Sequence, residues 1–257
     1  MKKWQVDELL VYQMDSREEM GRVSGEAVID AICAVLERKE EANVMFAAAP
    51  SQNDVLETVM TSERIDWSRV NGFHMDEYIG LSAAAPQGFG NFLRTAVFNK
   101  RAFHEVFYIN PEAVDAQAEA ERYEELLYQH PMDVCILGVG ENGHLAFNDP
   151  EEARFDDTKL VRTVQLDDVC RQQQVNDGCF ASIDEVPKVA MTVTIPGLLR
   201  AERMFCVVPT ARKAQAIAHM LEDRGISTSC PASVLRTKKG ASLYLDSEAA
   251  SLLAQKV

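Results

Sequence analysis

The alternation of short apolar runs with longer amphipathic stretches is the feature that most limits how this chain can fold. Apolar runs bounded by turn-forming residues are typical of buried strands, whereas apolar residues at helical spacing indicate helices packed on a core. Strands that are separated by helices pair in parallel through crossover connections. The alternation therefore predicts a three-layer, Rossmann-like α/β fold, in which a mostly parallel sheet carries helices on both faces.

The expected elements can be placed along the chain. Strands are predicted at residues 9–14, 43–49, 70–75, 105–109, 134–137, 188–194, 204–208 and 243–245. Helices are predicted at residues 15–39, from 55 onward, at 91–98, 111–129 and 211–222, and from 247 onward. Pro111 would occupy a first helical turn, where proline is tolerated. The Ser51-x-x-Asp54 spacing predicts a helix cap just ahead of residue 55.

Length and composition indicate a single folded unit. The chain has 257 residues, of which 47% are apolar and 26% charged, enough for one substantial α/β core. No internal repeat, low-complexity tract or Gly/Ser/Pro-rich linker interrupts it. We therefore expect one domain over residues 1–257.

The cysteines and the N-terminus indicate a cytoplasmic protein. The N-terminal lysines are not followed by an apolar core, so no signal peptide is expected. No apolar stretch approaches the ~20 residues of a membrane span. The six cysteines form no C-x-x-C pair, and several lie in apolar runs. Reduced, mostly buried thiols fit this pattern better than a disulfide framework does.

The charge balance limits the partners. A net charge of −14 argues against nucleic acid, which basic patches bind. A small anionic substrate remains compatible, because screening confines distant repulsion to roughly 10 Å and a few local cations can dominate a site. The sequence predicts a small-molecule ligand, no nucleic-acid or membrane partner, and leaves self-association into a homo-oligomer open.

A glycine-rich loop carries the most informative side chains. It runs over residues 138–150, reads GVGENGHLAFNDP, and follows the apolar run 134–137 directly. His144 would thus stand at the carboxyl end of a buried strand, with Asn142 and Asp149 on the same loop. In open α/β sheets that edge is where ligands bind.

The same loop also matches the string G-x-G-x-x-G, which raises dinucleotide binding as an alternative. That fingerprint requires a long helix opening on the glycines. Here Pro150 follows within one or two turns and disfavours such a helix. The glycines fit better as positions where the backbone bends tightly near a small substrate. We expect no cofactor and no metal.

Other strand ends carry polar residues of suitable kinds. Ser51 and Gln52 follow one predicted strand, Asp76 and Glu77 follow another, and Lys213 lies near the start of a helix after a third. Free N–H groups at a helix start suit a phosphate, and a carboxylate can act as a general base. Because the carboxyl ends of parallel strands share one edge, these residues are predicted to form one site with the histidine of the glycine loop.

Each of these residues also has a plain structural interpretation. Ser51 fits a simple helix cap, and adjacent acids such as Asp76 and Glu77 are usually solvated. His144 is compatible with a structural histidine, and Lys213 with a surface lysine. The shared edge is what favours the functional interpretation over these alternatives.

Two long motifs resemble the glucosamine-6-phosphate deaminase (isomerase) family. They are FHMDEYIGL at residues 73–81 and the glycine loop at 138–150, and the resemblance continues in order through 186–192, 213–214 and 230–235. Related 6-phosphogluconolactonases share the glycine–histidine core but follow it with a different ending. The ending AFNDP at 146–150 is similar to that of the deaminase branch.

The resemblance implies roles for individual residues. Asp76 would move a proton between C2 and C1 of the open-chain sugar, and His144 would open the ring with carboxylate help from Asp149. Asn142 stands where many relatives have aspartate. The 6-phosphate would be held by Lys213 with the Ser51 loop. The implied reaction converts glucosamine 6-phosphate to fructose 6-phosphate and ammonia.

Further substrate contacts are expected from Gln52, Glu77 and Arg171. Many relatives have a Gly-Gly-Thr-Pro phosphate loop where this chain reads AAAPSQN at 47–53, and Arg171 is a shifted substitute for their phosphate-binding arginine. These departures cluster around the substrate, so a different amino sugar phosphate is one alternative. Two others are a lactonase-type hydrolase, in which His144 would activate water, and a non-catalytic sugar-phosphate sensor.

Overall fold

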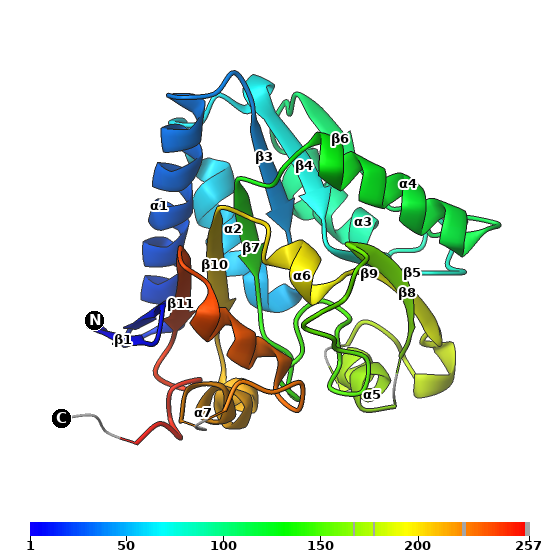
Figure 1. The fold of residues 1–257 in the computed structure, drawn as a ribbon. Coiled ribbons are helices and arrows are strands. Elements are labelled where there is room, and N and C mark those ends of the chain that lie inside the picture. Colours follow the sequence, from blue (N-terminus) through cyan, green and yellow to red (C-terminus); the bar gives the residue numbers. More distant parts are fainter. Residues whose placement is uncertain (167, 177, 223–224, 255–257) are drawn as a thin grey trace.

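The centre of the protein is an eight-stranded sheet with the strand order β1-β2-β11-β10-β7-β3-β4-β6. The computed structural model describes residues 1–257 except 167, 177, 223–224 and 255–257. The strands of this sheet are β1 (Lys2–Val6), β2 (Leu9–Gln13), β3 (Ala42–Phe46), β4 (Val70–His74), β6 (Glu105–Phe107), β7 (Val134–Leu137), β10 (Arg203–Val208) and β11 (Ala241–Leu245). Every neighbouring pair is parallel except β1 with β2. The predicted mostly parallel sheet is confirmed (Figure 1).

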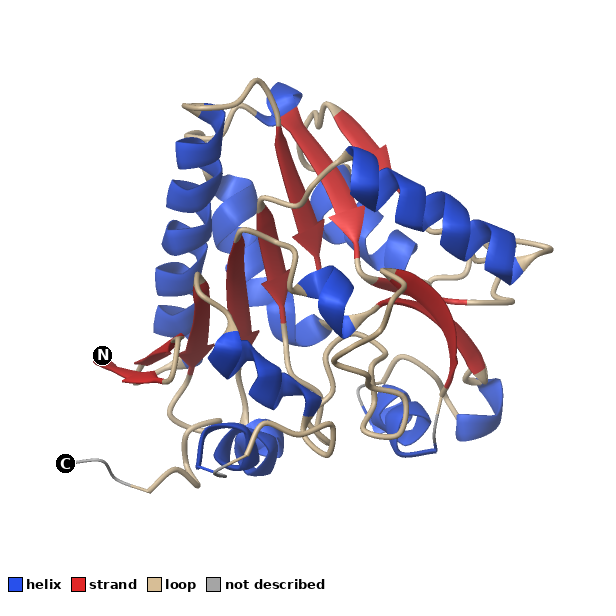
Figure 2. Ribbon diagram, in the orientation of Figure 1, coloured by secondary structure: helices blue, strands red, loops and turns tan. Residues whose placement is uncertain are grey.

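Helices cover both faces of this sheet, as Figure 2 shows. They are α1 (Arg17–Leu36), α2 (Asn53–Thr61), α3 (Phe89–Leu93), α4 (Ala116–Gln129), α6 (Ile195–Leu198) and α7 (Ala214–Glu222). Helix α5 (Asp168–Asn176) packs instead in a separate, smaller core. Alternate residues of one strand join different cores: Val134 and Ile136 pack with α1 and α2, whereas Cys135 and Leu137 pack with α4, α6 and α7. This two-residue period explains why the strands are continuously apolar, since both of their faces are buried.

A second, smaller sheet is antiparallel and was not expected. It has the order β5-β9-β8, from β5 (Asp76–Tyr78), β9 (Val189–Val193) and β8 (Val161–Gln165). The prediction that residues 188–194 extend the parallel sheet is therefore wrong. A buried apolar run indicates a strand but does not indicate its partner. The N–H of Val193 donates a hydrogen bond of 2.7 Å to the carbonyl of Met75, which fixes this small sheet beside the end of β4.

Several local expectations need correction. Helix α4 begins at Ala116, because the Asp115 carboxylate accepts the N–H groups of Gln117 and Ala118, so Pro111 precedes the helix. Ser51 is not a helix cap: it lies in the 3-10 turn η1 (Pro50–Gln52), and α2 begins two residues later without a side-chain cap. Residues 247–250 form turns instead of the expected final helix.

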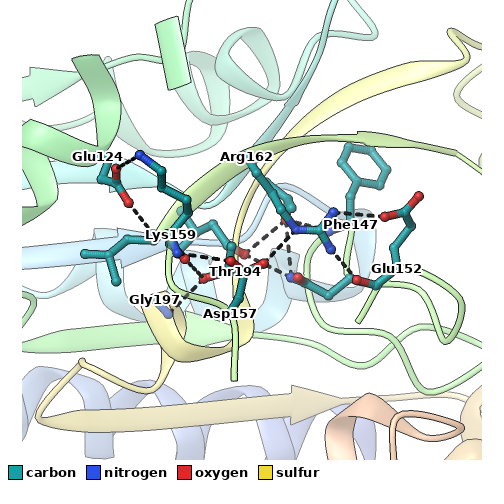
Figure 3. A network of polar contacts seen from close by, with 12 residues as sticks. Glu124, Phe147, Glu152, Asp157, Lys159, Arg162, Thr194 and Gly197 are labelled. Carbon is teal, nitrogen blue, oxygen red and sulfur yellow. Dashed lines mark hydrogen bonds and ion pairs between the residues drawn. The ribbon is translucent and has the colours of Figure 1, made fainter. Parts of the chain in front are cut away.

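The segment between the glycine loop and β8 is held by a network of polar contacts (Figure 3). Arg162 of β8 pairs with Glu152 at 2.9 Å and with Asp157 at 3.0 Å. Glu124 of α4 accepts the N–H of Leu160, and Thr194 donates to the carbonyl of residue 159 at 2.7 Å. The chain that leaves the glycine loop is thus attached to α4 and to the small sheet.

Candidate active site

A pocket of about 710 Å³ lies at the carboxyl ends of β3, β4, β7 and β10. These strands run in the same direction (Figure 1), so the residues that follow them meet at one edge. The wall formed there consists of residues 47–53, 75–76, 138–140, 210, 212 and 213. The histidine of the glycine loop and part of α5 complete the pocket. The structure thus brings all of the predicted strand-end residues except Glu77 to this pocket.

Not all predicted site residues face this pocket. Those that line it are Ser51, Gln52, Asp76, His144 and Lys213. Four predicted site residues are not among the described residues that line the pocket: Asn142, Asp149, Glu77 and Arg171. The first two of these contact the imidazole of the glycine loop, whereas the other two are engaged elsewhere, as described below.

The imidazole of His144 is fixed through its Nδ1 atom. Nδ1 lies 2.8 Å from Oδ1 of Asn142 and 3.0 Å from Oδ1 of Asp149. The amide Nδ2 of Asn142 donates in turn to the Asp149 carboxylate at 2.8 Å. Both oxygens accept the same proton, so Nδ1 carries it, which leaves Nε2 as the ring's proton acceptor.

The glycine loop makes this placement possible. A Cβ atom at Gly140 would lie 2.2–2.4 Å from ring atoms of His144, so only glycine lets the imidazole lie against the loop. The loop is joined to β9 by the N–H of Phe147, which donates to Thr192 Oγ1 at 3.1 Å, and by Asn148 Nδ2, which donates to Val193 O at 2.9 Å.

Asp149 remains an anion although it is buried. Burial would raise the pKa of its carboxyl group, but the charge of His144 and hydrogen bonds from His144, Asn142 and Cys170 outweigh this effect and lower the pKa. The carboxylate is 1% exposed. It can therefore stabilise positive charge on the neighbouring imidazole in a site of low polarity.

Asp76 is a second buried acid of the site and lines the pocket itself. It begins β5 and is 7% exposed. Burial, and then the charge of Glu77, raise its pKa well above the usual aspartate range. A desolvated carboxylate of this kind is a stronger base than an aspartate in water, which suits proton abstraction from carbon.

Glu77 has a structural position that sequence reasoning did not foresee. Its carboxylate accepts the N–H groups of Tyr78 and Phe89 at 2.9 Å and of Gly90 at 2.7 Å. It thus ties the small sheet to the first turn of α3. The sequence predicted that Glu77 contacts the substrate. In the structure its carboxylate is instead directed at backbone N–H groups.

Arg171 is likewise placed outside the pocket, contrary to the expectation. Its guanidinium pairs with Asp168 at 2.9 Å and donates to Ile183 O at 2.6 Å and Val186 O at 3.2 Å. It therefore joins α5 to the turn at residues 183–186. The face of α5 that meets the pocket is formed instead by Gln173, Gln174 and Asn176.

Two cations that sequence reasoning missed also line the pocket. Arg212 precedes Lys213 in the 3-10 turn η5 (Ala211–Lys213), and Arg17 reaches the pocket from the first turn of α1. Arg17 also pairs with Asp54 at 2.7 Å. The adjacency of Arg212 to the predicted lysine was a usable signal, whereas the position of Arg17 depends on how α1 packs.

The turn that carries these cations has an unusual backbone. Thr210 lines the pocket with φ 80° and ψ 146°, a conformation that side chains, and β-branched ones above all, rarely adopt. Its N–H donates to the buried carboxylate of Asp246 at 3.0 and 3.2 Å. The neighbouring strand β11 thereby fixes the direction in which η5 leaves β10.

His74 supports Asp76 from inside the core. Its Nδ1 donates to the Asp76 carbonyl at 2.9 Å, and its Nε2 accepts the N–H of Ile109 at 3.0 Å. Both ring nitrogens are used only if the ring is neutral. Burial lowers the pKa of His74 to about 4. Protonation would place two N–H groups against each other at Ile109.

We expect this histidine to make folding pH-dependent. Below pH ~6.5 the unfolded chain binds a proton at His74 that the folded protein does not bind until about pH 4, so the free energy of unfolding falls over this interval. The contribution is roughly 3 kcal/mol. In urea unfolding from pH 7 to pH 4.5, His74→Gln should show a flatter profile than wild type. His104→Gln, at a half-exposed histidine, is the control, and parallel profiles of His74→Gln and wild type would contradict the assignment.

No helix in the part of the chain that the structure describes is long and apolar enough to cross a membrane.

The fold and pocket define a Rossmann-like α/β protein with acid–base groups gathered at the carboxyl edge of its sheet. The chain belongs to the glucosamine-6-phosphate isomerase/6-phosphogluconolactonase family, whose model matches residues 15–244. It is 36% identical to a glucosamine-6-phosphate deaminase of Listeria welshimeri over 213 residues, which is 83% of this chain and 88% of the relative. It is 31% identical to a glucosamine-6-phosphate deaminase of Exiguobacterium sibiricum over 243 residues, 93% of this chain and 91% of the relative.

Solved structures agree with this assignment. A structure described as a monomeric glucosamine-6-phosphate deaminase superposes with a TM-score of 0.84 at 28% identity, covering 94% of this chain and 99% of the other. A 6-phosphogluconolactonase from Thermotoga maritima has a TM-score of 0.75 at 18% identity, covering 93% and 99% of the two chains. The second similarity is one of fold.

Proposed function

We propose that this protein is an enzyme that converts glucosamine 6-phosphate to fructose 6-phosphate and ammonia. The observation that carries the proposal is the placement of a desolvated carboxylate, Asp76, and an imidazole–carboxylate pair, His144 with Asp149, in one pocket. The relatives named as glucosamine-6-phosphate deaminases support the same reaction.

The imidazole is suited to opening the sugar ring. With its Nδ1 proton held by Asn142 and Asp149, Nε2 of His144 accepts the proton of the anomeric hydroxyl group and returns it to the ring oxygen. The imidazolium that forms in between is stabilised by the buried carboxylate. The product of this step is the open-chain aldehyde.

The buried aspartate is suited to the isomerisation. Asp76 takes the proton from C2 while the substrate's ammonium group gives a proton to the aldehyde oxygen, which leaves an enolamine. Asp76 then returns its proton to C1, which gives an iminium group at C2. Water then adds to C2 and ammonia leaves, so the ketose phosphate remains. A single carboxylate can serve both carbons because they are adjacent.

The phosphate requires cations in a chain whose net charge is −14. We assign this part of the substrate to Lys213 and Arg212, with Ser51 and the backbone of η1 on the wall formed by residues 47–53. A charge-assisted hydrogen bond to phosphate contributes roughly 1.5–3 kcal/mol. Gln52 lines the same wall, where its Nε2 donates to Val207 O at 3.0 Å.

Cellular context follows from the same proposal. None of the six cysteines, all of them in the described part of the chain, forms a disulfide, which fits a cytoplasmic enzyme. We propose a small-molecule sugar phosphate as the partner, without nucleic acid or a membrane. Self-association into a homo-oligomer stays an expectation.

One assay tests the proposed reaction. The 6-phosphates of glucosamine, galactosamine and mannosamine are incubated with the enzyme, and released ammonia is measured. We expect release from glucosamine 6-phosphate, and the other two sugars test the choice of epimer. Hydrolysis of 6-phosphogluconolactone with no ammonia from any of the sugars would replace the proposal with a lactonase.

A further inference from the structure

Three side chains with metal-binding atoms gather beside the active-site imidazole. The ligand atoms of His144, Asp149 and Cys170 all lie within 4.8 Å of one another. The imidazole Nδ1 and the carboxylate Oδ1 are 3.0 Å apart, and the thiol of Cys170 donates a hydrogen bond to the same carboxylate. The cluster joins the glycine loop to α5, two segments that are separate in the sequence.

The thiol lies close to the pocket although it is buried. Cys170 is 1% exposed. Gln173 and Gln174, one helical turn further along the same face of α5, line the pocket beside His144. The thiol therefore lies one helical turn from residues that line the pocket.

The donor set matches one class of ion. An imidazole nitrogen, a carboxylate oxygen and a thiolate are all ligands of Zn²⁺, whereas Mg²⁺ and Ca²⁺ take oxygen ligands. Zinc bond lengths place the ligands of a tetrahedral site roughly 3.3–3.6 Å apart. Nδ1 and the Asp149 carboxylate are already 3.0 Å apart, and the thiol, within 4.8 Å of both ligands, would move toward them to complete the site.

We propose that His144, Asp149 and Cys170 form an inhibitory binding site for Zn²⁺ within the acid–base machinery. The ion binds the carboxylate, the thiolate and Nδ1, and a pocket water takes the fourth position. One proton leaves from the thiol. The imidazole stays neutral, and its single N–H proton moves from Nδ1 to Nε2.

Inhibition follows from this change of tautomer. Once Nδ1 binds the metal, Nε2 carries the proton and can no longer accept one from the substrate hydroxyl. The Asp149 carboxylate, once bound to the metal, also no longer stabilises positive charge on the imidazole. The inhibitory effect rests on the proposed function, but the metal site itself does not.

The first experiment detects the site without any assay of activity. Co²⁺ is titrated into the protein as a spectroscopic substitute for Zn²⁺, and the charge-transfer absorption of thiolate-bound Co²⁺ is recorded. We expect the band in wild type and in Cys33→Ser, a control at a thiol of α1 outside the pocket lining, and its loss in Cys170→Ser. Zn²⁺ should abolish the band by displacement.

Two results would overturn the proposal: no thiolate band in wild type, or an undiminished band in Cys170→Ser. A band that is lost in Cys179→Ser instead would assign the metal to the other cysteine near the pocket. If Cys170→Ser does not fold, His144→Gln serves in its place, with Co²⁺ affinity expected to fall at least about tenfold.

The second experiment measures inhibition. Zn²⁺ should inhibit ammonia release by wild type and Cys33→Ser, EDTA should restore the activity, and Cys170→Ser should require at least about tenfold more Zn²⁺ for half-inhibition. Equal sensitivity of the three proteins would refute the inhibitory role. If no sugar phosphate releases ammonia, the proposed function fails, while the Co²⁺ spectrum still decides the metal site.

Discussion

Asp76→Asn is expected to lower kcat for ammonia release by about 10²–10⁴-fold, the usual contribution of a positioned acid–base group. The amide has the shape of the carboxylate but cannot accept the proton of C2. The substrate should still bind, because the cations of η5 are unchanged, so KM should move far less than kcat.

Exchange of the C2 hydrogen with solvent deuterium measures the step directly. It should fall in parallel with kcat in Asp76→Asn, while Asp30→Asn, on the exposed face of α1, should behave as wild type. A variant that retained wild-type exchange would remove Asp76 from the reaction. In wild type, kcat/KM should fall on acidification above the usual aspartate range, because the base must be ionised and burial raises its pKa.

The sequence was sufficient to predict the central sheet and the edge at which the pocket lies. Short apolar runs separated by helices leave few topologies other than a parallel sheet, and parallel strands end at one edge. Asp76, His144 and Lys213 each follow such a strand, so their convergence did not require side-chain detail. For the same reason, Ser51 faces the pocket although its predicted role as a cap is wrong.

What could not be predicted depends on contacts between distant segments. A hydrophobic period does not show whether residues 189–193 extend the main sheet or form a second one beside Asp76. The direction of the Arg171 side chain could not be predicted either. Its partners at 183–186 are backbone carbonyls, which every residue has and which no sequence motif marks. Arg17 was missed because its helix position is typical of a surface residue, and only the packing of α1 brings it to the pocket.

Asp149→Asn is expected to impair ring opening by about 10²–10⁴-fold, since it removes the negative charge that stabilises the imidazolium of His144. The orientation of the ring should survive, because Oδ1 of Asn142 lies 2.8 Å from Nδ1 and can hold the proton without help. Transfer of the proton between C2 and C1, which Asp76 performs on the open-chain sugar, should be affected much less.

Asn142→Ala is the matched variant, because it removes one of the two acceptors of the Nδ1 proton and keeps the negative charge. In that protein the carboxylate at 3.0 Å from Nδ1 still stabilises the imidazolium, so we expect a smaller loss than in Asp149→Asn. The measurement separates the two steps: ring opening is followed by exchange of the anomers, and proton transfer by deuterium exchange at C2 of substrate supplied in its open form. Full ring-opening activity in Asp149→Asn would show that orientation by Asn142 is sufficient and that the buried charge is not used. A larger loss of ring-opening activity in Asn142→Ala than in Asp149→Asn would mean that the orientation of the imidazole matters more than the negative charge beside it.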